Sequence, residues 1–313
     1  MSSGYSQTIK NLNGCTIMDG HFVLKKLLGA GAFGTVYLAE RVSRGKGGDK
    51  ERFAVKVMPK HAPTSLEKKQ LNDELLLQMA ASGHRNVLKA REVSHATLKG
   101  EEFVCIRMDL CKQDMLDAIY EGAFDSEERA RSAFLQIVDG VMHSHENGVY
   151  HRDLKFENIL CSGKGKDFSL QIADFGLATK ESIITNGWYA GTSKFMPPEC
   201  ISSAYRRPQG YSPAQQDTWA IGFMLAMVCG NNMNPWDIAC PNRDARFDYY
   251  TEDTSRLRGM LPDASDELIE MLRFKVLTVD PSERASLQEL RSFIETAPLF
   301  KKEKGFFSKL FNS

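Results

Sequence analysis

Two short segments in the middle of the chain carry acidic, basic and amide side chains at spacings suited to phosphoryl transfer. The first, H-R-D-L-K-F-E-N, contains Asp153, Lys155 and Asn158, and the second, A-D-F-G, contains Asp174. Phosphoryl transfer needs a carboxylate at the attacking hydroxyl and oxygen ligands for magnesium more than it needs covalent chemistry. We predict that Asp153 takes the first role and that Asn158 and Asp174 take the second. Lys155, two residues after the aspartate, can reach the transferred phosphate.

A glycine-rich segment near the N-terminus could hold the phosphates of a nucleotide. Gly29, Gly31 and Gly34 stand in L-G-A-G-A-F-G-T-V, where the missing side chains let backbone amides approach phosphates closely. Taken alone, the segment fits a glycine-rich hairpin turn without a ligand equally well. Lys56 ends a later predicted strand in A-V-K, which predicts that it lies under the loop and neutralises the α- and β-phosphates.

Such a lysine needs a carboxylate to hold it in place. The helix predicted after Pro63 offers Glu67, Asp73 and Glu74, and spacing alone leaves all three open. Each could instead be a solvated carboxylate on the helix face.

The elements that position these residues fall into two regions. Residues 22–57 read as strands rich in β-branched and aromatic residues with glycine-rich turns between them, which predicts an antiparallel sheet. After Pro63 the apolar residues recur at helical spacing, which predicts one helix in this region. From Met115 onward most apolar residues follow the helical period, so we predict a largely helical second half that begins near residues 110–113.

Composition limits the classes of protein to consider. The 313 residues suffice for one large or two-lobed domain, and 40 acidic against 40 basic residues give no reason to expect a nucleic-acid partner. Seven cysteines without a C-x-x-C pair predict reduced thiols. The N-terminus has no signal pattern and the longest apolar stretch is too short for a transmembrane segment. We expect a monomer in the cytoplasm or nucleus.

These segments together resemble the eukaryotic protein kinase family, over roughly residues 22–294. M-P-P-E-C is similar to the family's A-P-E segment, with Pro197 where alanine is usual. The resemblance implies that Asp217, in D-T-W-A-I-G, braces the backbone of the H-R-D-L-K-F-E-N segment, the catalytic loop of the family. It also implies that Arg284, in D-P-S-E-R, pairs with Glu199.

The resemblance implies a two-lobed α+β fold with ATP and Mg2+ between the lobes. The small lobe, residues 22–110, is expected to be an antiparallel sheet with one main helix, and the larger lobe, residues 111–297, to be helical. An N-terminal extension, residues 1–21, and an amphipathic C-terminal tail, residues 298–313, are expected to flank them.

The resemblance also selects residues around the nucleotide. It favours Glu74 as the partner of Lys56, because E-L-L-L-Q-M leads to H-R-N as in kinases, although Glu67 and Asp73 stay possible. Met108 is expected to guard the back of the adenine pocket, with core packing as its alternative role, and the backbone of residues 109–111 to bond the base. The other residues predicted to line the nucleotide site are Val36, Ala54, Asp109, Cys111 and Asp114.

The acceptor is expected to be a serine or threonine of a protein substrate. H-R-D-L-K, with Gly191 and Thr192 before P-P-E, resembles the Ser/Thr kinases and not the tyrosine kinases. Strings such as I-L-C, P-P-E-C and N-M-N-P-W resemble fungal Ran-type kinases, which are linked to nutrient state and meiotic entry. A catalytically weak scaffold would be expected to lack Lys56, Asp153 or Asp174. A small-molecule kinase would be expected to lack the G-T to P-P-E segment.

Regulation and specificity are further expectations from the resemblance. In such kinases the arginine at the position of Arg152 commonly pairs with a phosphate on the activation segment, which here is residues 174–199. Trp188 stands where many relatives have a phosphothreonine, so we expect activity without phosphorylation. Asp114 and Glu157 match positions that contact a substrate arginine three residues before the acceptor, with ribose contact or solvation as alternatives. Met227 stands where the next acidic subsite would be, so only that one upstream arginine is expected to matter.

The C-terminal tail has Phe307 and Phe311 four residues apart among lysines, which predicts a short amphipathic helix. We expect it to pack on the kinase's own surface. Partner docking and weak membrane contact are the alternatives.

Overall fold

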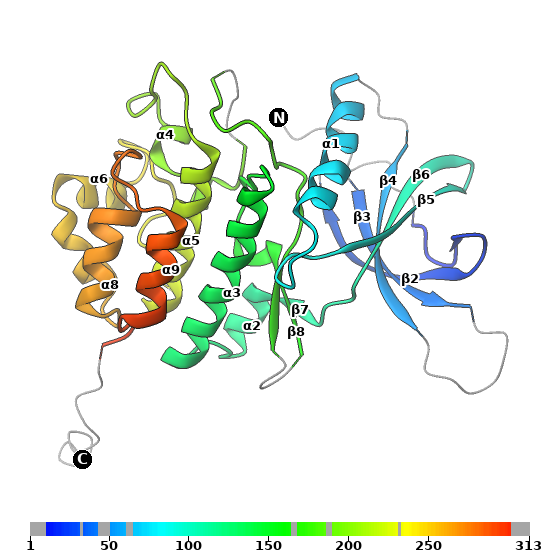
Figure 1. The fold of residues 1–313 in the computed structure, drawn as a ribbon, viewed down its shortest axis with the longest axis horizontal. Coiled ribbons are helices and arrows are strands. Elements are labelled where there is room, and N and C mark those ends of the chain that lie inside the picture. The colour runs from blue at the N-terminus through cyan, green and yellow to red at the C-terminus, as the bar shows by residue number, and fades with distance from the viewer. Residues whose placement is uncertain are drawn as a thin grey trace, which may run out of the picture.

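The computed structural model describes residues 11–31, 34–42, 51–60, 65–163, 168–185, 190–230 and 233–301, with the side chains of the first helix described from Asp73 onward. Figure 1 shows an antiparallel sheet with one helix beside it at one end of the molecule and a larger group of helices at the other. The predicted two-lobed α+β fold is confirmed.

The small lobe is a six-stranded antiparallel sheet in the order β1-β2-β3-β4-β6-β5. Its central strand β4 (Arg52–Pro59) is buried on both faces over most of its length, because A-V-K-V-M combines apolar residues with the buried Lys56. The register sets Lys56 opposite Val36 on one neighbour and Ile106 on the other. The remaining elements are β1 (Thr16–Ile17), β2 (Phe22–Gly31), β3 (Gly34–Arg41), β5 (Ala90–Leu98), β6 (Glu101–Met108) and the helix α1 (Ser65–Ala81).

Part of the predicted N-terminal extension belongs to this lobe. Residues Leu12 and Ile17 are buried in the same apolar cluster as Tyr37 of β3, and β1 pairs with β2. The amide of Leu12 also donates a hydrogen bond to the hydroxyl of Tyr37 at 3.3 Å. Residues 11–21 therefore stabilise the sheet that carries Lys56.

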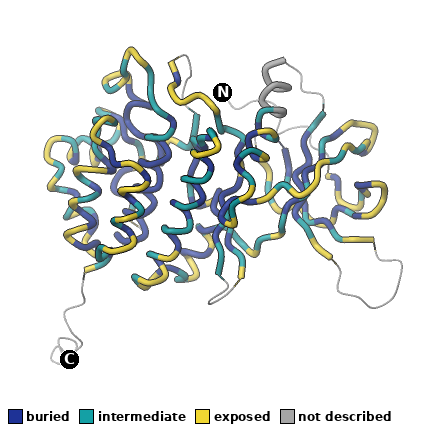
Figure 2. Tube along the Cα trace, viewed as in Figure 1, coloured by how far each residue is buried: buried dark blue, intermediate teal, exposed yellow. Residues whose placement is uncertain are grey.

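The large lobe is built around α5 (Pro213–Cys229), in which nearly every residue is buried. A helix that is apolar on all sides is stable only inside a protein, and Figure 2 shows dark blue running through the interior helices of this lobe. Around it lie α2 (Met115–Tyr120), α3 (Glu127–Glu146), α4 (Pro198–Ile201), α6 (Ala245–Glu252), α7 (Leu257–Met260), α8 (Asp266–Met271) and α9 (Leu287–Thr296).

A three-stranded sheet, β7-β8-β9, lies on the side of the large lobe that faces the small lobe. Its strands are β7 (Gln113–Asp114), β8 (Ile159–Ser162) and β9 (Ser169–Ile172). Because β8 follows the catalytic loop directly and β9 precedes Asp174, this sheet fixes the distance between the two predicted catalytic segments.

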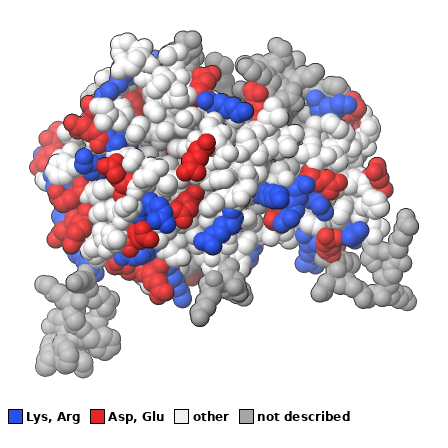
Figure 3. All heavy atoms as spheres, viewed as in Figure 1, with Lys and Arg blue, Asp and Glu red and all other residues white. Residues whose placement is uncertain are grey.

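The surface and the C-terminus add two observations. Basic and acidic side chains are interspersed over the face drawn in Figure 3, in keeping with the balanced composition. Within the described ranges, none of the helices is both long enough and apolar enough to cross a membrane. Leu299 is buried in the large lobe, whereas the tail residues Phe307 and Phe311 lie outside the described residues, so the predicted amphipathic helix stays a prediction.

Candidate active site

An ion-paired lysine joins the two lobes. Lys56 of β4 is 9% exposed, and its ammonium bonds the carboxylate of Glu74 from α1, which is 2% exposed. The same nitrogen lies 3.2 Å from Oδ1 of Asp174 in the large lobe. The structure thus pairs Lys56 with Glu74 and not with its half-buried neighbour Asp73, while the side chain of Glu67 lies outside the described residues.

Burial and charge act in opposite directions on this cluster. Burial lowers the pKa of Lys56, but the carboxylates of Asp174 and Glu74 outweigh it and raise that pKa above its ordinary value of 10.5. Burial likewise raises the pKa of Asp174, yet the Lys56 ammonium holds it below the ordinary 3.8. Lys56 is therefore cationic and Asp174 anionic throughout the neutral range.

Asp174 is partly open to solvent. Its side chain is 48% exposed, and its backbone adopts φ of 63°, a left-handed conformation that non-glycine residues adopt at a cost of about 1–2 kcal/mol. The carboxylate that holds Lys56 therefore stays accessible to a cation. Strain of this kind persists only where the surrounding structure maintains it, and here the residue follows β9 and is bonded to Lys56.

The carboxylate of Asp153 is held by contacts with three residues, Thr192, Lys155 and Asn158. Its Oδ1 accepts from the backbone amide and the hydroxyl of Thr192, at 2.7 and 2.8 Å. Its Oδ2 lies 3.2 Å from the ammonium of Lys155, which also donates to the Thr192 hydroxyl at 3.1 Å. In this geometry one carboxylate oxygen of Asp153, Oδ1, accepts a hydrogen bond from an alcohol while Lys155 lies beside the other, Oδ2.

Asn158 connects Asp153 to the Asp174 segment. Its side-chain nitrogen donates to the backbone carbonyl of Asp153 at 2.8 Å and to Oδ2 of the same residue at 3.3 Å. Its backbone carbonyl accepts from the amide of Ala173 at 2.8 Å. Because the nitrogen is committed to Asp153, the amide oxygen is the atom of this side chain that can ligate a cation.

The side-chain oxygens of Asn158 and Asp174 suit magnesium, which takes some of its ligands from substrate and water. They suit less well a metal whose ligands all come from the protein. Among the described residues, no three His, Cys, Asp or Glu side chains gather closely enough to hold a metal. Mg2+ is usually bound through one or two carboxylates together with substrate phosphates and water. Asn158 and the half-exposed Asp174 supply a donor set of that kind.

The backbone of the catalytic loop is fixed by a buried aspartate, as the resemblance implied. Asp217 is fully buried, and its carboxylate accepts from the amides of His151 and Arg152 at 2.8 and 2.7 Å. Arg152 has φ of 69°, so these bonds maintain a left-handed turn just before Asp153. Nδ1 of His151 accepts from the amide of Asp153 at 3.2 Å, which sets the tautomer whose Nε2 donates to Ala173.

The described glycines of the glycine-rich segment lie on adjacent strands. Gly29 pairs with Val36, and Gly31 pairs with Gly34 at the ends of β2 and β3. A Cβ on Gly34 would lie 2.6 Å from the backbone oxygen of Val57 on the neighbouring strand β4, so only glycine fits there. The close packing of β3 on β4 keeps this segment near Lys56.

An apolar cluster spans the two lobes behind the catalytic groups. Ala54 and Met108 face each other across β4 and β6, and they share a buried cluster with Ala173. Val36 of β3 and Leu160 of β8 pack against the same cluster. Met108 is 5% exposed, so packing and the predicted place at the back of an adenine pocket are compatible.

The side chains of Asp109 and Cys111, in the segment whose backbone is predicted to bond the base, are bonded to other protein groups. Asp109 forms a two-pronged ion pair with Arg91, one bond of which is 2.8 Å. The thiol of Cys111 bonds Oε1 of Gln171 at 3.6 Å, and burial raises its pKa. The backbone groups of residues 109–111 are therefore the ones to consider for binding a base.

The three residues considered for substrate recognition differ in their exposure and in the contacts that they make. Oδ1 of Asp114 accepts from the amide of Asp117 at 2.9 Å and so caps α2, while Glu157 is exposed. Met227 lies in the buried core of the large lobe, which explains its apolar character without reference to substrate.

Two residues that the sequence analysis did not single out touch the catalytic loop. The hydroxyl of Tyr211 accepts from Nη2 of Arg152 at 3.1 Å, and Nε2 of Gln216 donates to the carbonyl of Arg152 at 2.7 Å. Neither residue type has a distinctive spacing in the sequence. Only their position before and in the first turns of α5 brings them to this loop.

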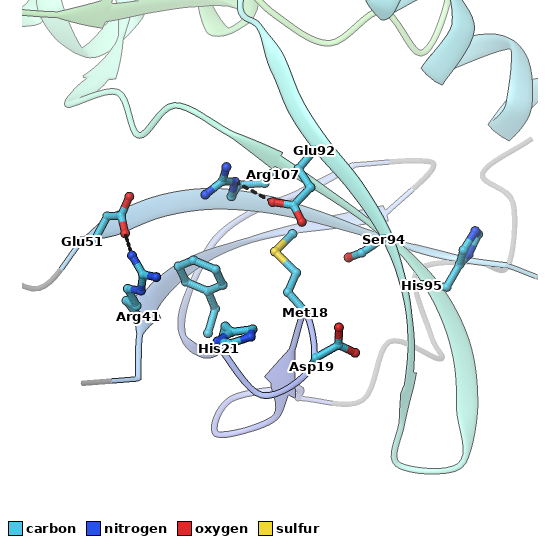
Figure 4. A pocket seen from close by; sticks show the side chains of 10 residues that line it. Met18, Asp19, His21, Arg41, Glu51, Glu92, Ser94, His95 and Arg107 are labelled. Carbon is cyan, nitrogen blue, oxygen red and sulfur yellow. Dashed lines mark hydrogen bonds and ion pairs between the residues drawn. The ribbon is translucent and has the colours of Figure 1, made fainter. Parts of the chain in front are cut away.

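A separate hollow of about 490 Å³ lies on the small lobe, between the turn after β1 and strands β3, β5 and β6. Figure 4 shows that charged side chains on its wall pair with one another, Arg41 with Glu51 and Arg107 with Glu92. Its lining includes none of the predicted catalytic residues. It is therefore distinct from the site around Lys56.

Comparisons with known proteins agree with this geometry. A family model described as the protein kinase domain matches residues 22–293. A negative regulator of sexual conjugation and meiosis from Schizosaccharomyces pombe is 30% identical, over 86% of this chain and 58% of the relative. The serine/threonine-protein kinase ksp1 of the same yeast is 31% identical, over 84% of this chain and 54% of its own.

A third relative is the serine/threonine-protein kinase VHS1 of Saccharomyces cerevisiae, 30% identical over 74% of this chain and 50% of its own length. The chain thus matches between half and three-fifths of the length of these relatives.

Proposed function

The chain belongs to the protein kinase family, and from that premise we propose that it transfers the γ-phosphate of MgATP to serine and threonine hydroxyls of proteins. The observation that carries the proposal is that Lys56 and Asp174 meet between the lobes, with Asp153 linked to them through Asn158. The resemblance to serine/threonine-protein kinases supports the choice of acceptor.

The small-lobe residues bind and orient the nucleotide in this proposal. Lys56, held by Glu74, neutralises the α- and β-phosphates, and the glycine segment offers backbone amides to the phosphates. Val36, Ala54 and Met108 enclose the base. Asn158 and Asp174 would hold magnesium, which when bound neutralises charge on the phosphates.

The large-lobe residues act on the acceptor. Asp153 orients the substrate hydroxyl and takes its proton as the new bond between oxygen and γ-phosphorus forms and the bond to the β,γ-bridging oxygen breaks. Lys155 stabilises charge on the transferred group. The bond from the Thr192 hydroxyl to Asp153 at 2.8 Å supports this role, since it is the contact that an acceptor alcohol would make.

Replacing Asp153 by Asn tests the proposal. Because the amide keeps the shape but cannot take the proton, we expect phosphate transfer to a protein substrate to fall by a factor of about 100 or more, with nucleotide binding retained. Asp263→Asn, at an exposed position on the large lobe, is the matched control and should leave transfer unchanged. Equal activity of wild type and Asp153→Asn would refute the assignment.

The pathway and the preferred substrate sequence can also be proposed. We propose that the protein acts in nutrient or cell-cycle signalling, because the regulator of conjugation and meiosis is among its relatives. The exposed Glu157 supports a preference for arginine three residues before the acceptor. A positional peptide library in which upstream arginine made no difference would remove that preference.

A further inference from the structure

The segment from Tyr211 to Gln216 contacts both the catalytic loop and the activation segment, residues 174–199. Tyr211 lies just before α5, and Gln216 lies in its first turns. Each of the two residues makes contacts on both sides. Given the proposed kinase function, these contacts bear on how the site is kept in order.

Tyr211 contributes through its backbone and its side chain. Its backbone forms a two-bond bridge with Ile184 of the activation segment, through N–H to O contacts of 2.9 and 3.1 Å. Its hydroxyl accepts from Nη2 of Arg152 at 3.1 Å. One residue therefore links the activation segment to the arginine that precedes Asp153.

The preceding residue has to be glycine for this bridge to form. Gly210 has φ of 87°, and a Cβ there would lie 2.2 Å from the backbone oxygen of Ile184. Both the left-handed backbone and the lack of space exclude a side chain. The close approach of the two segments is thus specific to the G-Y sequence.

Gln216 makes a second link, nearer to the end of the activation segment. It is 1% exposed, and its Nε2 donates to the carbonyls of Arg152 and Ala190, at 2.7 and 2.8 Å. Its Oε1 is buried without a hydrogen-bond partner among the described residues. An unpaired buried acceptor is costly, and the side chain keeps this orientation because its nitrogen donates both of the bonds that it makes.

We propose that Tyr211 and Gln216 are positioning residues whose uncharged side chains hold the activation segment on the catalytic loop, so that the kinase is active without a phosphate on this segment. The guanidinium of Arg152, which could otherwise bind such a phosphate, donates to a phenol instead. Its carbonyl is held at the same time, and its amide is held by Asp217 at 2.7 Å. Protein groups, and not a phosphate, thus order this part of the chain.

Two substitutions separate these contacts. Tyr211→Phe removes the hydroxyl alone, and Gln216→Glu keeps the shape but sets carboxylate oxygens against two carbonyls. We expect kcat/KM for a protein substrate to fall about tenfold in Tyr211→Phe, which loses one hydrogen bond from a charged donor. In Gln216→Glu we expect a fall of about a hundredfold, because the buried carboxylate repels the two carbonyl oxygens. KM for ATP should stay within about twofold, because Lys56 and Asp174 are untouched.

Exposed residues of the same types are the controls. Tyr120 is 79% exposed, and Gln288 is exposed on α9. Tyr120→Phe and Gln288→Glu should leave all rates unchanged. Equal losses in these controls, or a rise in KM for ATP as large as the fall in kcat, would overturn the positioning role.

Phosphatase treatment of the wild-type protein supplies the decisive comparison. We expect the dephosphorylated protein to transfer phosphate at a rate within about twofold of the untreated protein. Loss of transfer with ATP binding intact would overturn the proposal.

If neither preparation transfers phosphate, the proposed function itself fails, and hydrogen exchange still tests the two links. The amides of Ile184 and Tyr211 should exchange slowly in the wild type and faster in Gln216→Glu, at temperatures where both stay folded. Fast exchange in the wild type would contradict an ordered segment.

Discussion

At the scale of single residues, the site depends on which carboxylates Lys56 can reach. Glu74 is almost completely buried and bonds the ammonium directly, while Asp174 lies 3.2 Å away and stays half exposed. The two carboxylates have different roles for that reason. Glu74 fixes the position of the lysine, and Asp174 remains available to a cation.

Glu74→Gln tests this division of roles. The amide keeps the shape but loses the charge, so Lys56 should move toward Asp174 and bind phosphates poorly; we expect kcat/KM for ATP to fall by a factor of about 10–100. Steady-state kinetics over a range of ATP concentrations measure the effect.

Asp73→Asn is the matched control, because Asp73 is the adjacent carboxylate that the sequence left as an alternative. It should change kcat/KM for ATP by less than about twofold, since a half-buried side chain away from Lys56 does not hold the lysine. A larger loss in Asp73→Asn than in Glu74→Gln would reverse the assignment.

At the scale of elements, a buried ion pair joins the activation segment to the C-terminal part of the large lobe. Arg284 bonds both carboxylate oxygens of Glu199, at 2.7 and 3.3 Å. The same guanidinium donates to the carbonyls of Gln215 and Thr278, both at 3.0 Å, and its carbon lies 5.0 Å from the ring centroid of Trp219. One arginine therefore connects α4, α5 and the segment before α9.

Arg284→Met should lower the free energy of unfolding by about 3–5 kcal/mol, because it leaves the carboxylate of Glu199 buried and unpaired. Urea denaturation followed by circular dichroism measures it. The control is Arg207→Met, which breaks the partly exposed pair with Asp280 and should cost less than about 1 kcal/mol. Similar losses in the two variants would show that burial of the pair does not matter.

The sequence predicted the elements better than the contacts between them. Strand alternation, helical periodicity and the H-R-D to D-F-G spacing are local patterns, so they predicted both lobes and the catalytic segments. The choice between Asp73 and Glu74 depends on which face of α1 meets β4, which spacing did not decide. The contacts of Tyr211 and Gln216 with Arg152 join residues about sixty positions apart, and no local pattern predicts them.

At the scale of the whole molecule, the two lobes contribute different halves of one site. Lys56 comes from the sheet of the small lobe and Asp174 from the large lobe, and their ion pair crosses between them. The apolar cluster that includes Ala54 and Ala173 crosses at the same place. A nucleotide bound there would contact both lobes, and magnesium would connect its phosphates to the large lobe.

Magnesium-dependent nucleotide binding therefore tests the central claim most directly. Calorimetric titration of ATP into the wild type should show binding that Mg2+ strengthens, and Asp174→Asn should lose that dependence on Mg2+, with Asp263→Asn behaving as wild type. Failure of the wild type to bind ATP, or binding to which Mg2+ and Asp174 make no difference, would contradict the account.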